Sequence, residues 1–427
     1  MRPMLRSKRG LKNYGSIDRM NATSPAAAHQ PPSESDLTRM HGYRNERVRA
    51  ELRRRDYAAA LFCDAINVRY ATGSRNMQVW TLRNPARYVL VMAEGPTVMF
   101  EFGGCDHLVR GLETIQEIRR TTSWFYFTSG PRIAEHAHRW AAEIADIVGQ
   151  HGGGNRRLAV DRVNPEGCSA LQALGISVHD GQEIAERARA IKSPDEIRCL
   201  RAAIAVCESG LSRVRDALVP GVTENQLLAI LNEANIAAGG EYIETRLLTA
   251  GPRTNPWFQE SSARPVRAGE LLAIDTDMIG PQGYFADMSR TFLCGEQRPT
   301  PAQRDLYRLA HEQVETNTAL LRPGVGFREF MQASWTMPDR FVAHRYMSLV
   351  HGAGLCGEYP YIPYPQDFER KGYDGLFEEN MTVCVESFIG DEHGGEGVKL
   401  EQLVLITKDG PVPLTTFPFE DSLLKLS

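Results

Sequence analysis

Acidic residues in the second half of the chain stand at the ends of apolar runs, where a charge is costly to bury. The apolar run 271–274 leads into Asp275, Asp277 follows two residues later, and a hairpin-like return brings Asp287. In a strand, residues i and i+2 lie on the same face. Three carboxylates among apolar neighbours repel one another unless protons or a cation compensate them. The pattern favours a divalent metal site on strands, suited to Fe, Mn, Mg or Zn. The alternative is two solvated carboxylates at a strand end and an ordinary surface aspartate.

A histidine and two glutamates occur in similar surroundings further along the chain. His351 follows an apolar run and precedes a glycine, Glu386 ends the apolar run 382–385, and Glu401 lies inside the run 397–405. Taken singly, a histidine beside glycine is more often structural, and a glutamate in a strand is usually on its exposed face. As a set, three aspartates, a histidine and two glutamates suit two metal ions bridged by carboxylates.

The length of 427 residues predicts two or three domains. A helical pattern over 33–56 precedes short apolar runs at 58–62, 68–70, 88–92 and 97–102, which predict strands. Ser193 and Pro194, followed by two acids, favour the start of a long helix. A helix, a Pro-Gly-Val turn and a second helix occur twice, which indicates an internal duplication. We predict an extended arm over 1–34, an α/β domain over 35–188 and an α+β domain over 189–427.

Composition excludes several classes of function. The formal net charge of −4 argues against a nucleic-acid binder. No apolar run reaches the length of a membrane-spanning helix. The eight cysteines form no C-x-x-C pair, which indicates reduced thiols and a cytoplasmic location. Residues 1–33 carry six basic residues and one acidic residue without the apolar core of a secretory signal. For this segment we favour an arm lying on the body or on a partner subunit over a transit peptide.

The order of these residues resembles that of the pita-bread metallopeptidases, which include prolidases and Xaa-Pro aminopeptidases. The likeness rests on Asp287-Met-Ser-Arg-Thr-Phe292, on His351-Gly-x-Gly354 and on Lys399-x-Glu401, and it covers about residues 190–420. Upstream, the smaller domain is similar to the creatinase and prolidase N-terminal domain. The resemblance implies an α+β fold with a C-terminal pita-bread domain and a smaller α/β creatinase-like N-terminal domain. It implies the metal ligands Asp275, Asp287, His351, Glu386 and Glu401.

Two departures count against peptide hydrolysis. The peptidases carry a histidine seven residues after the ligand histidine, where this chain has Glu358. They carry another upstream of the first metal aspartate, whereas this chain has no histidine between residues 187 and 310. Without these imidazoles, amide hydrolysis lacks a positioned acid and a partner for the oxyanion.

The resemblance is most specific to one branch, the metal-dependent dimethylsulfoniopropionate lyases of the DddP type. The shared segments include 69–80, 244–260 and His351-Gly-x-Gly-x-Cys356, and Asp277 would be a sixth metal ligand. The branch implies a homodimer and two divalent ions, with iron favoured and zinc or manganese as alternatives. The lyases have an aspartate, proposed as the catalytic base, where this chain has Gly357. Glu358 and Tyr346 are the nearest replacements by sequence, and with Asp287 they form our set of catalytic candidates.

Elimination from a sulfonium acid requires a held carboxylate, a base at about 3 Å from the α-proton, and aromatic or negative surroundings for the cation. The candidates for substrate binding are the aromatic residues Trp80, Trp257 and Phe258, with Tyr346 as a further candidate aromatic, and Arg253 for the carboxylate. Alternatively, Trp257 and Phe258 belong to the core, Trp80 lies at a domain or subunit contact, and Arg253 pairs with an acid.

The sequence thus predicts a lyase that cleaves dimethylsulfoniopropionate, or a related sulfonium or betaine-like acid, to dimethyl sulfide and acrylate. The substrate is a small molecule, and neither a nucleic acid nor a membrane is expected as a partner. The first alternative is a hydrolase of the Xaa-Pro peptidase type or an enzyme acting on another small acid. The second is a metal-binding protein without catalysis, against which the full set of ligand-type residues argues.

Overall fold

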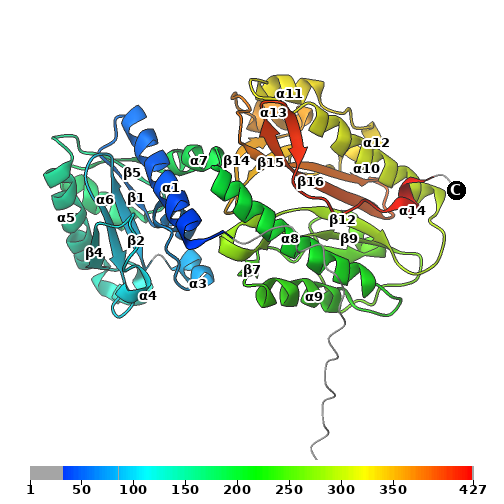
Figure 1. Ribbon diagram of the computed structural model, residues 1–427, viewed down its shortest axis with the longest axis horizontal. Helices are drawn as coiled ribbons and strands as arrows, with labels where there is room; N and C mark the ends of the chain where they lie inside the picture. The colour runs from blue at the N-terminus through cyan, green and yellow to red at the C-terminus, as the bar shows by residue number, and fades with distance from the viewer. Residues whose placement is uncertain (1–31, 85, 426–427) are drawn as a thin grey trace, which may run out of the picture.

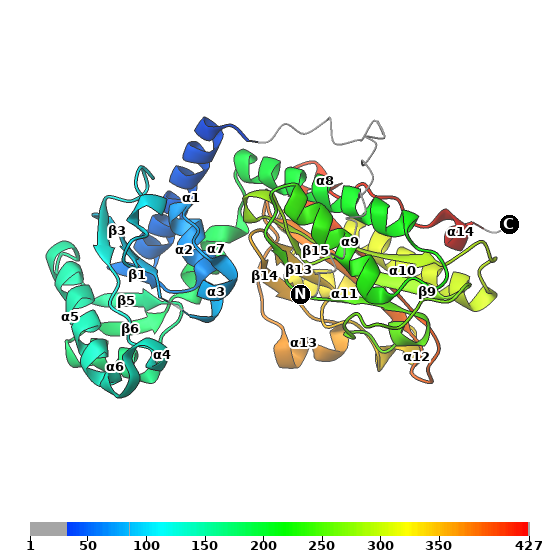
Figure 2. The ribbon, with the colours of Figure 1, turned by 90° about the horizontal axis from the view of Figure 1, so that it is seen from below.

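The computed structural model describes residues 32–84 and 86–425. An N-terminal part and a C-terminal part lie side by side, with helix α7 (Gln182–Ala190) at their junction (Figures 1 and 2). The arm predicted over residues 1–34 falls almost entirely outside the described residues. The predicted boundary between residues 188 and 189 falls in the last turn of α7, and we retain it as a proposal.

The N-terminal part is built around a six-stranded sheet with the order β4-β3-β2-β1-β5-β6. Strand β1 pairs antiparallel with β2 and parallel with β5, so the sheet is mixed. Its central strands are buried along their whole length between helices. The strands are β1 (Ala59–Phe62), β2 (Tyr88–Met92), β3 (Thr97–Glu101), β4 (Glu117–Arg120), β5 (Arg157–Val160) and β6 (Ser177–Asp180). The helices before α7 are α1 (Glu34–Arg54), α2 (Ala65–Thr72), α3 (Gln78–Arg83), α4 (Tyr126–Ser129), α5 (Ile133–His151) and α6 (Pro165–Ala173), with 3-10 turns η2 (Asp106–Leu108) and η3 (Gly130–Arg132).

One predicted strand is wrong. The run 68–70 belongs to helix α2, whose N-terminus is capped by the Asp64 side chain and whose C-terminus is ended by Gly73 with φ of 81°. Every residue of this helix is buried, including the polar Asn67, Arg69 and Thr72. A short apolar run of this kind has the same pattern in a buried helix as in a buried strand. The runs at 58–62, 88–92 and 97–102 do form strands, namely β1, β2 and β3.

The C-terminal part begins with α8 (Pro194–Asp216), whose start agrees with the prediction. The Ser193 side chain accepts from the Glu196 backbone, and the Glu196 side chain accepts from the Ser193 backbone. This capping box satisfies two backbone donors that a helix end leaves without partners. Helix α9 (Glu224–Ala237) packs against α8. The second predicted helix pair is also present, as α10 (Pro301–Ala319) and α11 (Phe327–Ala333), but α10 packs on β15 and β16 and α11 on α13. The remaining helices are α12 (Asp339–Val342), α13 (Pro365–Lys371) and α14 (Asp421–Leu424).

The strands of the C-terminal part form three sheets, with the orders β11-β10-β7, β12-β9-β8 and β14-β13-β15-β16-β17. Helix α10 packs over β15 and β16, on the outside of the strands (Figure 1). This helix-covered arrangement is the predicted α+β fold. The strands are β7 (Tyr242–Ile243), β8 (Leu248–Ala250), β9 (Leu271–Asp275), β10 (Met278–Ile279), β11 (Phe285–Ala286), β12 (Ser289–Leu293), β13 (Val350–Ala353), β14 (Gly357–Ile362), β15 (Thr382–Gly390), β16 (Gly397–Thr407) and β17 (Gly410–Pro413), with 3-10 turns η4 (Gly251–Thr254) and η5 (Pro281–Gly283).

Buried ion pairs join the two parts. Arg44 of α1 lies 3.0 Å from Glu196 of α8, and Arg69 of α2 lies 2.8 Å from Glu241.

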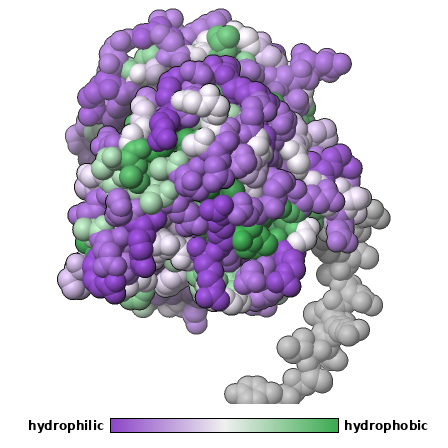
Figure 3. Space-filling view, turned by 90° about the vertical axis from the view of Figure 1, so that its left-hand side faces the viewer, coloured by the Kyte–Doolittle hydropathy of each residue, from purple (hydrophilic) through white to green (hydrophobic). Residues whose placement is uncertain are grey.

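The outer face of the N-terminal part is mostly hydrophilic, with small separate apolar areas (Figure 3). Within residues 32–84 and 86–425, no helix has the length and apolar character needed to cross a bilayer.

Candidate active site

The predicted metal ligands lie on neighbouring strands in the C-terminal part. Asp275 ends β9 and stands opposite Ser289 of β12, two residues after Asp287. Glu386 of β15 and Glu401 of β16 are directly paired across the sheet. His351 of β13 lies beside Cys384 of β15. Strand register thus sets the neighbours within each sheet, and packing of β9 and β12 against β16 brings the two sheets together.

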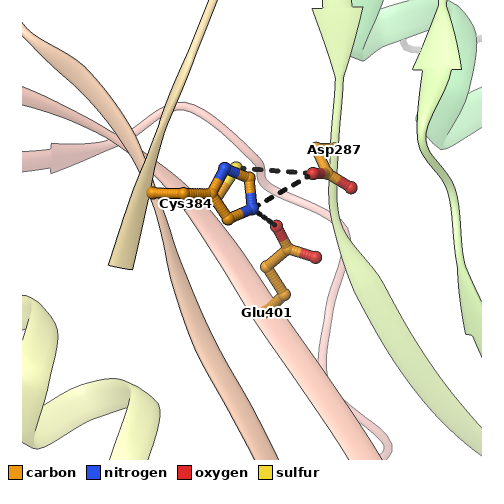
Figure 4. A group of neighbouring side chains, drawn as sticks. Asp287, Cys384 and Glu401 are labelled. Atoms are coloured by element: carbon orange, nitrogen blue, oxygen red, sulfur yellow. Dashed lines mark hydrogen bonds and ion pairs between the residues drawn. The ribbon is translucent and has the colours of Figure 1, made fainter. Parts of the chain in front are cut away.

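Two overlapping groups of side chains have atoms close enough to hold an ion. The donor atoms of Asp275, Asp277 and Asp287 lie within 4.8 Å of one another, as do those of Asp287, His351, Cys384 and Glu401. Asp287 belongs to both groups. The side chains of Asp287, Cys384 and Glu401 point toward one another (Figure 4). Glu386 is placed at the second group by its Oε1 atom, 3.1 Å from His351 Nε2. All six predicted ligand positions are thus adjacent, and their role as ligands stays a proposal.

The electrostatics of these groups fit a divalent cation. Burial, and next the charge of Asp275, raises the pKa of Asp277 to about 7. Burial and Glu386 raise the pKa of Glu401 to about 8, and burial and Glu401 raise the pKa of Asp287 well above its usual value. Asp287 Oδ1 and Glu401 Oε1 are buried without a hydrogen-bond partner among the described residues. Such oxygens are costly to leave unpaired, and a bound cation would satisfy them.

Lys399 and Ser289 hold the carboxylates in place, and the sequence reasoning assigned neither of them a role. The Lys399 ammonium donates to Glu386 Oε2 and to Ser289 Oγ, both at 2.6 Å. Ser289 Oγ lies 2.7 Å from Asp275 Oδ1 and 2.8 Å from Glu401 Oε2. Burial opposes ionisation of Asp275, but Lys399 and Ser289 outweigh it and lower the pKa of this group. The signal for Lys399 was its place two residues before Glu401, on the same face of a buried strand.

A cavity of about 720 Å³ opens onto the candidate metal ligands Asp277 and His351. Of the predicted substrate-contacting or catalytic residues, Tyr346 and Glu358 line it. Other lining residues that matter below are Asp180, Glu183, Glu186, Glu244, Cys356 and Gly357. The ring of Tyr346 lies 4.4 Å from the Lys399 ammonium on one side and stacks on Phe258 at 5.2 Å. Phe258 thus reaches the site through Tyr346.

Three other predicted substrate contacts lie in different surroundings. Trp257 is buried and packs against Phe388, with ring centroids 5.9 Å apart. Arg253 pairs with Glu224 at 3.2 Å. Trp80 lies in α3 of the N-terminal part and makes an edge contact with Phe102. None of the three lines the cavity in the part of the chain that the structure describes. Trp257 and Arg253 lie as the alternatives describe, whereas the ring contact of Trp80 joins two residues of the N-terminal part, and a substrate role for all three stays a prediction.

Glu358 is held by two cations. Its carboxylate contacts the Lys192 ammonium, and its other oxygen lies 3.0 Å from Arg189 Nε. Its side chain has no exposed surface. Proton uptake by this carboxylate would weaken both ion pairs, whereas burial, the largest influence, raises the pKa of Glu358 above its usual value. The prediction that Glu358 is catalytic is not tested by this arrangement, although the arrangement counts against it.

The two parts of the chain match two known sequence families. The metallopeptidase family M24 matches residues 198–408, and the creatinase/prolidase N-terminal domain matches residues 44–191. In solved structures, the chain resembles the prolidase from Pyrococcus horikoshii, with a TM-score of 0.70 and 19% identity over 88% of this chain and 99% of that one. It equally resembles the dipeptidase PepE from Mycobacterium ulcerans, with a TM-score of 0.70 and 21% identity over 90% and 97% of the two chains. These likenesses show the fold.

Sequence relatives identify the family more specifically than the solved structures do. The dimethylsulfoniopropionate lyase DddP of Roseovarius nubinhibens is 39% identical over 91% of this chain and 88% of its own length. The lyase of the same name from Roseobacter denitrificans is 40% identical over the same shares. A probable dipeptidase, PepE of Mycobacterium tuberculosis, is 29% identical over 58% of this chain. The chain therefore belongs to the metallopeptidase family M24 and, within it, to the family of the DddP dimethylsulfoniopropionate lyases.

Proposed function

We propose that this protein cleaves dimethylsulfoniopropionate to dimethyl sulfide and acrylate by β-elimination. The observation that carries the proposal is the identity of 39–40% with two lyases of that name over 91% of the chain. The six adjacent ligand-type residues support it, because the reaction requires a firmly held substrate carboxylate. When bound, two divalent cations supply Lewis acidity that holds a carboxylate and stabilises negative charge next to it.

The residues of the chain have separate tasks in this proposal. Asp275, Asp277, Asp287, His351, Glu386 and Glu401 would hold the metal ions, with Asp287 shared between them because it belongs to both groups. Lys399 and Ser289 would fix the orientation of the carboxylates. Tyr346, which lines the cavity with Phe258 stacked on its ring, would supply the aromatic surroundings of the sulfonium. Among metals, iron is our first proposal, with zinc and manganese as alternatives.

We further propose a homodimer in the cytoplasm. The resemblance to the lyase branch supports the dimer. The cytoplasmic location is supported by the eight cysteines, all of which are free thiols in the structure.

Headspace analysis of the purified full-length protein tests the main proposal. Protein stripped of metal and reloaded with Fe²⁺, Mn²⁺ or Zn²⁺ is given dimethylsulfoniopropionate, and dimethyl sulfide and acrylate are quantified. Equal amounts of both products, dependent on the added metal, are the expected result. The same samples receive Xaa-Pro dipeptides. Release of proline without dimethyl sulfide would instead establish the hydrolase alternative.

Metal binding is expected to stabilise the fold. A cation that binds the native state at one hundred times its dissociation constant adds about 2.7 kcal/mol to the free energy of unfolding. Thermal denaturation, followed with and without chelator, measures the effect as a higher melting temperature of the loaded protein. The Asp287→Ala variant is the control, because it removes the residue common to both groups. An equal metal response in this variant would place the binding elsewhere.

A further inference from the structure

The cavity lacks the aspartate that the sequence of the lyase branch led us to expect, so another group must take the α-proton. Three of the six carboxylates that line it are engaged by cations. Glu358 contacts Lys192 and Arg189, Glu186 contacts Arg189, and Glu183 lies 2.7 Å from Arg55. Each of them is thus committed to an ion pair, and protonation would weaken that pair.

Two further lining carboxylates, Asp277 and Asp180, have partners other than cations. Asp277 belongs to the first ligand group and contacts the Thr245 hydroxyl. Asp180 ends β6 in the N-terminal part, where its side chain accepts from the backbone of Gln182 at 3.2 Å. Asp180 is thus turned toward the start of α7, and Asp277 is reserved for the metal in the proposed function.

Glu244 differs from all of these. No hydrogen bond or ion pair joins its carboxylate to another side chain within residues 32–84 and 86–425. It lines the cavity and has solvent-exposed surface there, as a group that must meet a substrate requires.

The backbone fixes Glu244 beside the ligand groups. Strand β7 pairs with β10 so that Ile243 stands opposite Met278, and the next pair in the register is Glu244 and Asp277. The Glu244 N–H donates to the Asp277 carbonyl at 2.9 Å. The free carboxylate therefore projects from the main-chain position adjacent to a ligand of the first group.

We infer that Glu244 is the catalytic base of the elimination, in place of the carboxylate that Gly357 does not supply; this inference rests on the proposed function. Glu244 takes the proton from the α-carbon, and the C–H electron pair becomes the α,β double bond. The bond between the β-carbon and sulfur breaks with its electrons going to sulfur. Neutral dimethyl sulfide and acrylate leave, and the protonated Glu244 then returns its proton to water.

Gly357 offers a way to test the assignment within the same cavity. A Cβ atom built there has one neighbour, His351 Nδ1 at 3.9 Å, which is ordinary van der Waals contact. Gly357 is also absent from the residues with positive φ, so an aspartate fits its backbone. The Cβ atom of the variant Gly357→Asp therefore fits without a close contact, and the variant introduces a second carboxylate into the cavity lining.

The experiment compares the metal-loaded full-length protein with Glu244→Gln, Gly357→Asp/Glu244→Gln and the control Glu233→Gln. Glu233 is an exposed glutamate of α9, outside the cavity. Dimethyl sulfide release is measured together with exchange of the α-hydrogens of the substrate in deuterium oxide. Glu244→Gln should lower kcat at least about a hundredfold, the usual effect of losing a general base, with unchanged metal content. The double variant should regain at least tenfold over Glu244→Gln, and Glu233→Gln should match the parent.

The outcomes separate the inference from the proposed function. If the parent releases dimethyl sulfide and Glu244→Gln matches it, the inference is overturned and the function stands. If the parent releases none but exchanges α-hydrogens in a manner that depends on Glu244, the function fails and the base assignment holds. Suppose that Glu244→Gln loses dimethyl sulfide release, that the double variant recovers none of it, and that both keep full metal content. This result would overturn the assignment in favour of a positioning role.

Discussion

Replacing Glu401 by glutamine is expected to lower kcat/KM for dimethyl sulfide release by at least about a thousandfold, or about 4 kcal/mol of activation free energy. Glu401 belongs to the second ligand group, and its Oε1 atom is buried without a hydrogen-bond partner among the described residues. An amide of the same shape cannot supply the negative charge that a divalent cation requires. Metal content, measured by elemental analysis of the purified protein, should fall below that of the parent.

The same substitution should leave the fold intact. Because the pKa of Glu401 is raised to about 8, this group is mostly neutral at pH 7 when no cation compensates it. Glutamine resembles this neutral form and keeps an oxygen for the Ser289 hydroxyl. Glu233→Gln serves again as the control for a lost surface charge. A Glu401→Gln protein with full metal content and the parent rate would remove Glu401 from the ligand set.

The largest effect on stability is expected from Glu358→Ala. The substitution leaves Lys192 and Arg189 buried without their shared carboxylate. Loss of one partner from a buried ion pair costs about 3 to 5 kcal/mol, because the remaining charge is uncompensated. Urea denaturation of the metal-loaded protein measures the cost as a lower midpoint. The double variant Glu358→Leu/Lys192→Met should be less destabilised, because it removes one of the stranded cations as well.

This variant also tests whether Glu358 is catalytic, as the sequence led us to expect. Below its unfolding transition, Glu358→Ala should retain a kcat within a few-fold of the parent if the only role of Glu358 is to connect β14 to α7 through its ion pair with Arg189. A hundredfold loss of kcat in the folded variant would restore Glu358 as the base. A cost under about 1 kcal/mol would show that the two cations find other partners, contrary to the ion-pair argument.

Local signals in the sequence predicted much of the fold. Ser193 and Pro194 marked the start of α8 correctly, because capping depends on a few neighbouring residues. The strand predicted over residues 68–70 is wrong because the burial of this run on every side depends on parts of the chain that are far away in the sequence. The fold class and the family were predicted from the resemblance of long motifs, and the family matches and the sequence relatives confirm both.

The candidate site was predictable only in part. The six ligand positions were identified through their order along the chain, which a family shares even where the sequences differ. The roles of Lys399, Ser289 and Glu244 depend on which strand lies beside which, and that register is not encoded near any of them. Glu358 was proposed as a base because it is adjacent to Gly357 in the sequence. That adjacency does not indicate its ion pairs with Arg189 and Lys192, which lie more than 160 positions away.

The open space beside Gly357 has a consequence for how such a cavity changes over generations. Two of the four glycine codons differ from an aspartate codon by a single nucleotide. Because the added side chain meets only ordinary contact with His351, one point mutation could introduce an acid there while Glu244 still works. Two acids could then coexist until drift removed either one. The proton-accepting role could in this way pass between two positions without a generation that lacks the activity.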